Sequence, residues 1–411
     1  MTVLLSLSVA IFAGLMLTRL LNRWRLPDVT AYLIAGVLIG PCLLGRLGIA
    51  GVGFDSYAQI EDLGLISDVA LGFIAFSIGH EFRVAQLKAT GRQAVIIGVL
   101  QAVVTTACVD VALFLFHALR PDVLSLPAAI TLGAIAAATA PAATLMVVRQ
   151  YKAKGSLVDL LLPIVALDDA VGLALFAVSF GVAKALTSGD VDFYSIIVNP
   201  VLEIVGSLAL GALAGWLLTK LERLFHSNRN RVAMTIGFVF LTVALSKLSV
   251  RFGALTQSFS PLLVCMMLGS VFCNLCPVSD EIMNRADKWS SPLMVLFFVL
   301  SGAELELGAL ARPAPALVGV AYILSRSFGK YFGARESSRM MGCSPKIVKY
   351  LGITLFPQAG VALGMCVSAA ELPGDGALIR NIVLFAVLVY ELVGPVMTKW
   401  ALTRAGDITP K

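Results

Sequence analysis

The chain has 411 residues, of which 58% are hydrophobic and only 14% are charged. Soluble domains carry about 25% charged residues, so this composition excludes a soluble globular protein and indicates a polytopic membrane protein. The formal net charge of +6 reflects the loops between membrane segments and is no sign of nucleic-acid binding. Cys273 and Cys276 form a lone CxxC with no second pair and no neighbouring histidine, so we expect no cofactor.

Thirteen apolar segments follow one another along the chain, and their lengths suit helices that cross or enter a hydrocarbon core about 30 Å thick. The first segment lacks a basic start and a small-residue cleavage site, so we expect a membrane span rather than a signal peptide. The segments cover residues 2–21, 28–45, 60–80, 92–117, 125–150, 156–185, 194–219, 231–249, 258–275, 288–308, 313–334, 346–371 and 377–401.

Lys and Arg residues are distributed unevenly between alternate loops. If the amino terminus lies outside, the cytoplasmic loops carry about three times as many Lys and Arg residues as the outer loops, as the positive-inside rule requires. We therefore expect a multi-pass protein of a bacterial inner (plasma) membrane, with its carboxyl terminus in the cytoplasm. The loops are short, so we expect no soluble regulatory domain, no extramembrane catalytic module and no enzyme activity.

The fifth segment is interrupted at Thr139, Ala140 and Pro141, and Thr144 follows one turn later. Proline removes a helical hydrogen bond and moves the preceding residue out of the helical region. Within a membrane, the freed backbone groups must find partners in the protein or in a water-lined cavity. An ordinary proline kink is the alternative interpretation of this one site.

Asp168 and Asp169 are adjacent in the apolar run from Leu160 to Ala183. A carboxylate at the centre of a membrane helix costs about 2.5–3.5 kcal/mol on insertion scales. Such a pair is rarely tolerated unless it faces a wet cavity and binds something positive. An intramembrane aspartyl protease needs acids on two helices, whereas these two lie on one helix and point about 100° apart.

The eleventh segment supplies the cations Arg326 and Lys330, which are four residues apart and share one helix face. We expect Lys330 to neutralise one carboxylate of the acid pair. Either cation could instead extend to the membrane surface, and Arg326 could pair with Asp168 or with Glu304. Gly329 and Gly333 leave a thin strip where another helix can approach closely.

A second proline break, at Pro357, Gln358 and Gly360, lies seven segments after the first. Matched interruptions in two halves are typical of a transporter built from inverted repeats, with its binding site at the midplane. We therefore predict an all-α polytopic membrane protein with thirteen transmembrane helices, in one transporter domain. Its first six-helix repeat covers about 2–185, a linker helix covers about 194–219, and the inverted repeat covers about 231–401.

Taken together, these motifs resemble the cation:proton antiporter superfamily, in particular its bacterial sodium/proton and potassium/proton antiporter branch. The resemblance covers nearly the whole chain and implies a homodimer, a core domain and two broken helices that cross near the acids. It implies that Asp169 binds the ion and that Asp168 pairs with Lys330. Many relatives carry a polar residue where this chain has Ala140, so Thr139 or Thr144 would complete the ion shell. The motifs are Leu167-Asp168-Asp169-Ala170, Thr139-Ala140-Pro141, Arg326…Gly329-Lys330 and Gln358-Ala359-Gly360.

The sequence therefore predicts a secondary active transporter in the lipid bilayer that exchanges a monovalent cation for H⁺ by alternating access. We expect this exchange to be electrogenic. Na⁺ is the expected cation, with K⁺ or Li⁺ as alternatives. Na⁺ needs several oxygen ligands, which Asp169 and Asp168 can begin to supply. A carboxylate that leaves water favours its neutral form, so the same acid can hold a proton instead. A cation channel and a sodium-coupled organic-anion symporter remain alternatives.

Overall fold

The computed structural model describes most of the chain, including nearly all of the segments expected to be helical. The described residues are 2–21, 23, 28–47, 53–85, 91–140, 144, 147–148, 151–188, 199–248, 250–252, 255–257, 259–305 and 313–408. Pro141, which was predicted to cause the first break, lies outside these ranges.

Within the described ranges the regular secondary structure is helical apart from one short hairpin, in which β1 (Val250–Phe252) pairs antiparallel with β2 (Leu255–Gln257). Each of the thirteen apolar segments contains helix. The α-helices are α1 (Thr2–Leu21), α2 (Asp28–Ile39), α3 (Tyr57–Glu61), α4 (Gly64–Glu81), α6 (Gly91–Leu119), α7 (Leu126–Ile135), α9 (Ser156–Ser188), α10 (Asn199–Glu222), α11 (Asn228–Ser246), α12 (Pro261–Leu275), α13 (Ser279–Ala303), α15 (Pro313–Met340), α16 (Pro345–Thr354), α17 (Gly360–Ala369) and α18 (Gly376–Ala405).

Five helical stretches in the described part of the chain are long and apolar enough to cross a bilayer by themselves. They are α1, α6, α10, α18, and α2 continued through the 3-10 turn η2 (Leu44–Leu47). Several other helices are apolar but shorter, among them α7 and α17. Short apolar helices are expected where a membrane segment is interrupted, because each half then crosses only part of the hydrocarbon core.

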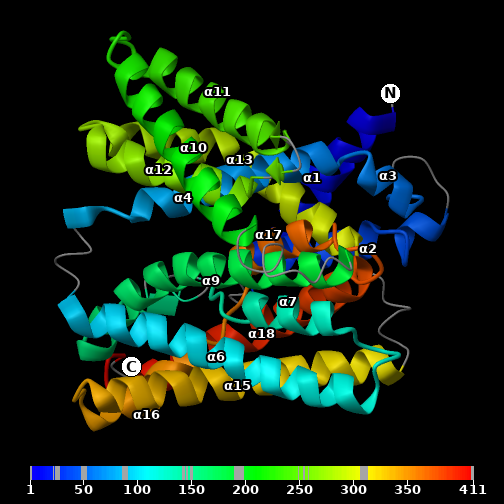
Figure 1. Ribbon diagram of the computed structural model, residues 1–411, viewed down its shortest axis with the longest axis vertical. Helices are drawn as coiled ribbons and strands as arrows, with labels where there is room; N and C mark the ends of the chain where they lie inside the picture. The colour runs from blue at the N-terminus through cyan, green and yellow to red at the C-terminus, as the bar shows by residue number, and fades with distance from the viewer. Residues whose placement is uncertain are drawn as a thin grey trace.

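The helices form two groups that meet along a common boundary (Figure 1). One group contains α1, α2, α4 and α10 to α13, and its closest packing joins α12 to α4 and α10. The other contains α6, α7, α9 and α15 to α18, and its closest packing joins α6 to α15 and α7 to α9. Across the boundary, α9, α17 and α18 contact α4, α10 and α2. The acid pair, the buried cations and both proline breaks therefore all belong to the second group.

The glycine strip on α15 is confirmed as a close contact, and its partner is α6. A Cβ atom on Gly329 would lie 2.8 Å from the Cα of Thr105, and one on Gly333 would lie 3.0 Å from the Cα of Gln101. Membrane helices use such small residues to bring their backbones together, because lipid tails leave little hydrophobic force between helices. The strip therefore sets the distance between Lys330 and the polar side chains of α6.

Both predicted interruptions are present in the fold. The helix α7 ends at Ile135, well before the end of its apolar segment, and the residues up to Ala140 are non-helical. The second interruption separates α16 from α17 at residues 355–359. The two meet directly, because the backbone N–H of Ala140 donates a hydrogen bond to the carbonyl of Pro357 at 2.9 Å.

Substitution of Gly329 by Val should force α15 away from α6. The added Cβ would meet backbone rather than a flexible side chain, so we expect a destabilisation of about 1–3 kcal/mol. A thermal unfolding midpoint in detergent measures this effect. Gly237→Val is the matched control, because nothing lies within 4 Å of a Cβ atom at that position. Equal midpoints for the two variants would contradict the close contact.

Candidate functional site

A fully buried ion pair joins the centres of α9 and α15. Asp168 and Lys330 are both 0% exposed, and Oδ2 of Asp168 lies 2.6 Å from Nζ of Lys330. Two charges can be held out of water only if they are paired and their remaining hydrogen-bonding groups are satisfied. The surroundings of this pair meet that requirement.

The polar neighbours of the ion pair come from α6 and from the first break. The amide of Gln101 on α6 donates to Oδ1 of Asp168, and the hydroxyl of Thr139 in the first break donates to Oδ2. The ammonium of Lys330 donates to Oε1 of Gln101 at 3.1 Å, to the carbonyl of Ala137 at 2.5 Å and to the hydroxyl of Thr139 at 2.9 Å. The network thus ties α6, α9 and α15 to the first break.

Arg326 binds backbone carbonyls rather than a carboxylate. Its guanidinium donates to the carbonyls of Ala136 at 3.0 Å, Ala138 at 2.7 Å and Phe356 at 2.8 Å, and lies 4.4 Å from the centre of the Tyr390 ring. These carbonyls follow the ends of α7 and α16, where the helix dipole is negative and carbonyls lack helical partners. Arg326 therefore caps both broken helices at once.

Three of the alternatives considered for the cations are wrong. Neither Arg326 nor Lys330 extends to the membrane surface, because both are 0% exposed. The donors of Arg326 are directed to carbonyls rather than to Asp168. Nor does Arg326 pair with Glu304, whose carboxylate lies 3.9 Å from Arg380. Spacing along the chain could not reveal these carbonyls, because every backbone position carries one.

Gln358 joins the second break to the end of α7 by a hydrogen bond. Its buried amide donates to the carbonyl of Ile135 at 3.1 Å and to the hydroxyl of Tyr322 at 3.0 Å. Gly360 begins α17, and a Cβ atom there would meet nothing within 4 Å. Space alone therefore does not require glycine at this position.

Thr144 and Asp169 are the remaining residues of the predicted ion shell. Thr144 is buried, and its hydroxyl donates to the carbonyl of Thr354 at 3.4 Å rather than to Asp168. Asp169 lies within α9, but its side chain is outside the described residues.

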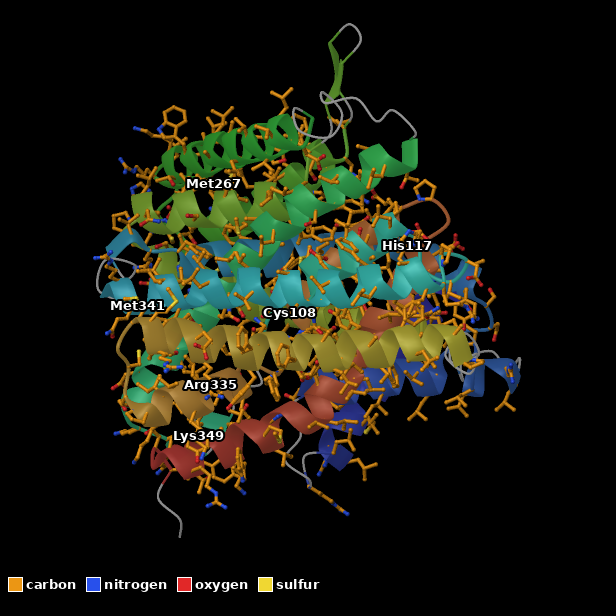
Figure 2. The ribbon with its side chains drawn as sticks, turned by 60° about the horizontal axis from the view of Figure 1, so that its bottom comes forward. Cys108, His117, Met267, Arg335, Met341 and Lys349 are labelled. Atoms are coloured by element: carbon orange, nitrogen blue, oxygen red, sulfur yellow. The ribbon has the colours of Figure 1, made fainter. Side chains whose placement is uncertain are left out.

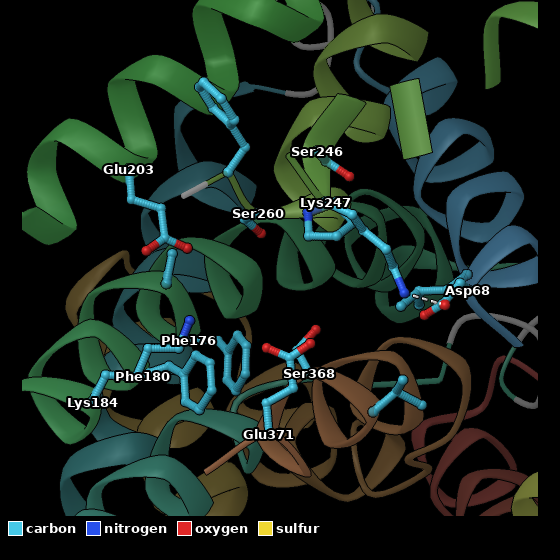
Figure 3. A pocket seen from close by; sticks show the side chains of 15 residues that line it. Asp68, Phe176, Phe180, Lys184, Glu203, Ser246, Lys247, Ser260, Ser368 and Glu371 are labelled. Carbon is cyan, nitrogen blue, oxygen red and sulfur yellow. Dashed lines mark hydrogen bonds and ion pairs between the residues drawn. The ribbon is translucent and has the colours of Figure 1, made fainter. Parts of the chain in front are cut away.

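A cavity of about 290 Å³ opens at the boundary between the two helix groups (Figure 3). Acidic side chains line it, among them Asp68, Glu203 and Glu371, and the ammonium of Lys247 donates to Asp68. Phe176 forms its wall on the side of α9 and stacks on Phe180. Phe176 is two turns from Asp168, or about 12 Å along the helix. The cavity thus lies about two turns of α9 away from the buried ion pair.

The sequence analysis missed Gln101, Tyr322 and Tyr390 as members of the site. Gln101 is 0% exposed and contacts both members of the ion pair. The one available signal was a glutamine in the middle of an apolar helix, since a buried amide without partners costs several kcal/mol in lipid. The two tyrosines carry no such signal, because aromatic residues are common in membrane helices.

Comparisons with known proteins agree with one another. A family model described as "Sodium/hydrogen exchanger, transmembrane" matches residues 7–404. The Na(+)/H(+) antiporter NhaS4 of Synechocystis sp. is 24% identical over 345 residues, covering 81% of this chain and 80% of its own length. The High-affinity Na(+)/H(+) antiporter NhaS3 of the same organism is 23% identical, covering 93% and 87%.

A solved structure gives the same fold. The sodium proton antiporter MjNhaP1 from Methanocaldococcus jannaschii at pH 8 superposes with a TM-score of 0.75 at 17% identity, covering 99% of each chain. At this level of identity the likeness concerns the fold alone. It confirms a helical antiporter fold for this chain.

Replacement of Arg326 should destabilise the crossing of the broken helices. In Arg326→Gln, at least one of the carbonyls of Ala136, Ala138 and Phe356 loses its donor, and each unsatisfied buried group costs about 1–3 kcal/mol. We expect a thermal midpoint well below that of the wild type. Arg223→Gln, at an exposed position directly after α10, is the control. A midpoint for Arg326→Gln that matches this control would show that the cap is dispensable.

Proposed function

We propose that this chain, which belongs to the sodium/hydrogen exchanger family, exchanges a monovalent cation for H⁺, and that the cation is Na⁺. Membership of this family makes the chain a multi-pass membrane transporter rather than an enzyme. The observation that carries this proposal is the buried Asp168–Lys330 pair beside the meeting point of two broken helices. Two of its relatives are named as Na(+)/H(+) antiporters, which supports Na⁺ over K⁺ or Li⁺.

The proposed chemistry is competition for carboxylate oxygens. Asp169 binds either the cation or a proton, and each neutralises it, so that the loaded site can move through the membrane interior at lower electrostatic cost. The hydroxyl of Thr139 and the free carbonyls of the breaks are further oxygen ligands for a hard cation. Thr144 belongs to this proposed shell only if its hydroxyl turns away from Thr354.

Lys330 would couple cation binding to a second proton. When Asp168 turns to the cation, Lys330 loses this counter-charge, and its neutral acceptors include Gln101, Thr139 and the carbonyl of Ala137. Loss of a counter-charge at a buried position disfavours an ammonium ion, so Lys330 can release its proton. Arg326 cannot take this part, because a guanidinium stays protonated. Two protons would then be exchanged for one cation, which makes transport electrogenic.

The architecture suits alternating access. We propose that the group containing the ion pair moves against the group containing α4, α10 and α12, with the cavity around Phe176 as the outer entrance. In this proposal the thirteen segments all span the membrane as two inverted repeats joined by a linker helix, which corresponds to α10. A homodimer in a bacterial plasma membrane, with the amino terminus outside, completes the proposal and follows from the family resemblance and the Lys and Arg distribution.

Asp169→Asn should abolish exchange without unfolding the protein. The amide keeps the shape of the carboxylate but loses both the charge and the titratable proton. In sealed vesicles with the membrane potential clamped, addition of Na⁺ should change the internal pH for the wild type and not for the variant. Asp159→Asn, at an exposed position in the first turn of the same helix, should transport normally. Near-normal exchange by Asp169→Asn would refute the assignment.

Lys330→Gln should remove or strongly reduce charge movement. Exchange of two protons for one cation moves a net charge, which can be recorded as a transient current on a solid-supported membrane after a Na⁺ jump. The wild type is expected to give a current, and Lys330→Gln to give exchange without current or no exchange. A wild-type protein that exchanges cations and protons without any current would overturn the two-proton coupling, although not the exchange function itself.

A further inference from the structure

A basic groove lies between α15 and α16, away from the ion pair and from the cavity around Phe176. Its volume is about 520 Å³, and Arg335, Arg339 and Lys349 line it together with Tyr331 and Val348. Figure 2 shows Arg335 and Lys349 on these neighbouring helices, at the end of the bundle that also carries Met341. No step of the proposed transport cycle uses these residues.

Among the described residues, few acidic side chains balance the charge of the groove. One carboxylate, that of Glu336, lies 3.8 Å from Arg335 and 3.9 Å from Arg339, which is the outer limit of an ion pair. The side chains of Arg335 and Arg339 are 49% and 72% exposed. Arg326 on the same helix has all its donors directed to carbonyls inside the protein, so these two arginines differ from it in pointing their donors outward. Three cations around one hollow therefore favour an anion with several oxygens.

The start of α16 adds a second feature that favours an anion. Pro345 and Val348 line the groove and belong to the first turn of α16, a helix of ten residues. The residue before this helix, Ser344, makes no side-chain capping hydrogen bond. The first N–H groups of a helix lack helical partners and carry the positive end of the dipole, and such an end is suited to phosphate.

An apolar track leads into the groove along α15. Leu324, Phe328 and Phe332 are 64%, 59% and 43% exposed, and the rings of Phe328 and Phe332 stack with their centres 5.6 Å apart. These residues are four apart, and the same face continues to Arg335 and Arg339. From Pro313 to Arg335 the helix rises about 33 Å, close to the thickness of the hydrocarbon core. Arg335 therefore lies at the level of lipid headgroups when Phe328 and Phe332 face the tails.

We propose that this groove binds an anionic phospholipid. Its phosphate lies among Arg335, Arg339 and Lys349, and an acyl chain lies along Phe332, Phe328 and Leu324. A soluble phosphate ester would use the cations but not the aromatic track. The continuity of the two surfaces on one helix face is the reason to assign a lipid rather than a soluble anion.

Occupation of the groove would stabilise the group of helices that contains the ion pair. The groove joins α15, which carries Lys330, to α16, one half of a broken helix. These helices are already in close contact, because a Cβ atom on Gly352 would lie 2.6 Å from the Cα of Tyr331. A bound phosphate would relieve the repulsion between the cations and hold the two helices together. Lipid binding should therefore raise the thermal stability of the whole chain.

The test uses the full-length protein, purified and delipidated in a neutral detergent. Thermal midpoints are measured with phosphatidylglycerol, with phosphatidylcholine of the same acyl chains, and with glycerol 3-phosphate. We expect phosphatidylglycerol to raise the midpoint by about 5 °C, as a ligand well above its dissociation constant can, and the other two to raise it by much less. An equal shift with phosphatidylcholine, an equal shift with glycerol 3-phosphate, or no shift with phosphatidylglycerol would overturn the proposal.

Variants test whether the stabilising lipid binds in the groove. Arg335→Gln/Arg339→Gln should lose most of the shift. Lys220→Gln/Arg223→Gln, which removes two exposed cations at and directly after the end of α10, should keep it. Phe328→Ser/Phe332→Ser should also reduce the shift. Retention of radiolabelled phosphatidylglycerol through gel filtration is a second measurement that needs no thermal transition, and it should fall at least threefold in the arginine variant. Equal retention by the two cation variants would place the lipid elsewhere and refute the site.

Discussion

The buried contact between Asp168 and Lys330 constrains everything around it, because two charges with no access to water must be satisfied entirely by the protein. Gln101 and Thr139 meet that demand, and each reaches the pair from a different element. A buried ion pair adds little net stability compared with apolar packing, but removal of one partner is costly. Its effect is therefore to specify how α6, α9 and α15 lie relative to the first break. The glycines of α15 that face α6 serve the same arrangement by keeping Lys330 within reach of Gln101.

The interrupted helices create the second demand. A helix that ends inside the membrane leaves carbonyls without partners where no lipid can supply one. Arg326 satisfies carbonyls from both breaks, Lys330 satisfies a further one, and Gln358 joins the second break to the end of α7. Lys330 is thus shared between the acid and the backbone. Because its ammonium also donates to neutral acceptors, Lys330 keeps hydrogen bonds when its carboxylate partner moves away. The pair is therefore suitable for a site whose charge must change during a transport cycle.

The helix α15 connects this interior to the membrane surface. On one face it carries the cations and glycines that pack against α6 and the breaks, and on another it carries exposed aromatic rings that lead to a basic groove. The same helix can therefore respond to the ion inside and to the lipid outside. Across the boundary between the helix groups, contacts are fewer, and the cavity lined by Asp68, Glu203 and Phe176 lies there. A boundary with fewer contacts and a cavity lined by charged side chains is where one group can shift against the other.

The sequence by itself determined the membrane class, the positions of the helical segments, both interruptions, and the presence of Asp168, Arg326 and Lys330 as charged residues within them. Each of these depends on a local property, such as the length of an apolar run, a proline, or a charge that lipid would not tolerate. Tertiary structure alone decided that Lys330 rather than Arg326 meets Asp168, that Glu304 lies beside Arg380, and that Gln101 and Tyr322 belong to the site. The partners in these contacts are far apart in the chain, and many of them are backbone carbonyls. Because every residue carries a carbonyl, no pattern of side chains shows which ones a helix end will leave unpaired, and only the packing of the helices settles it.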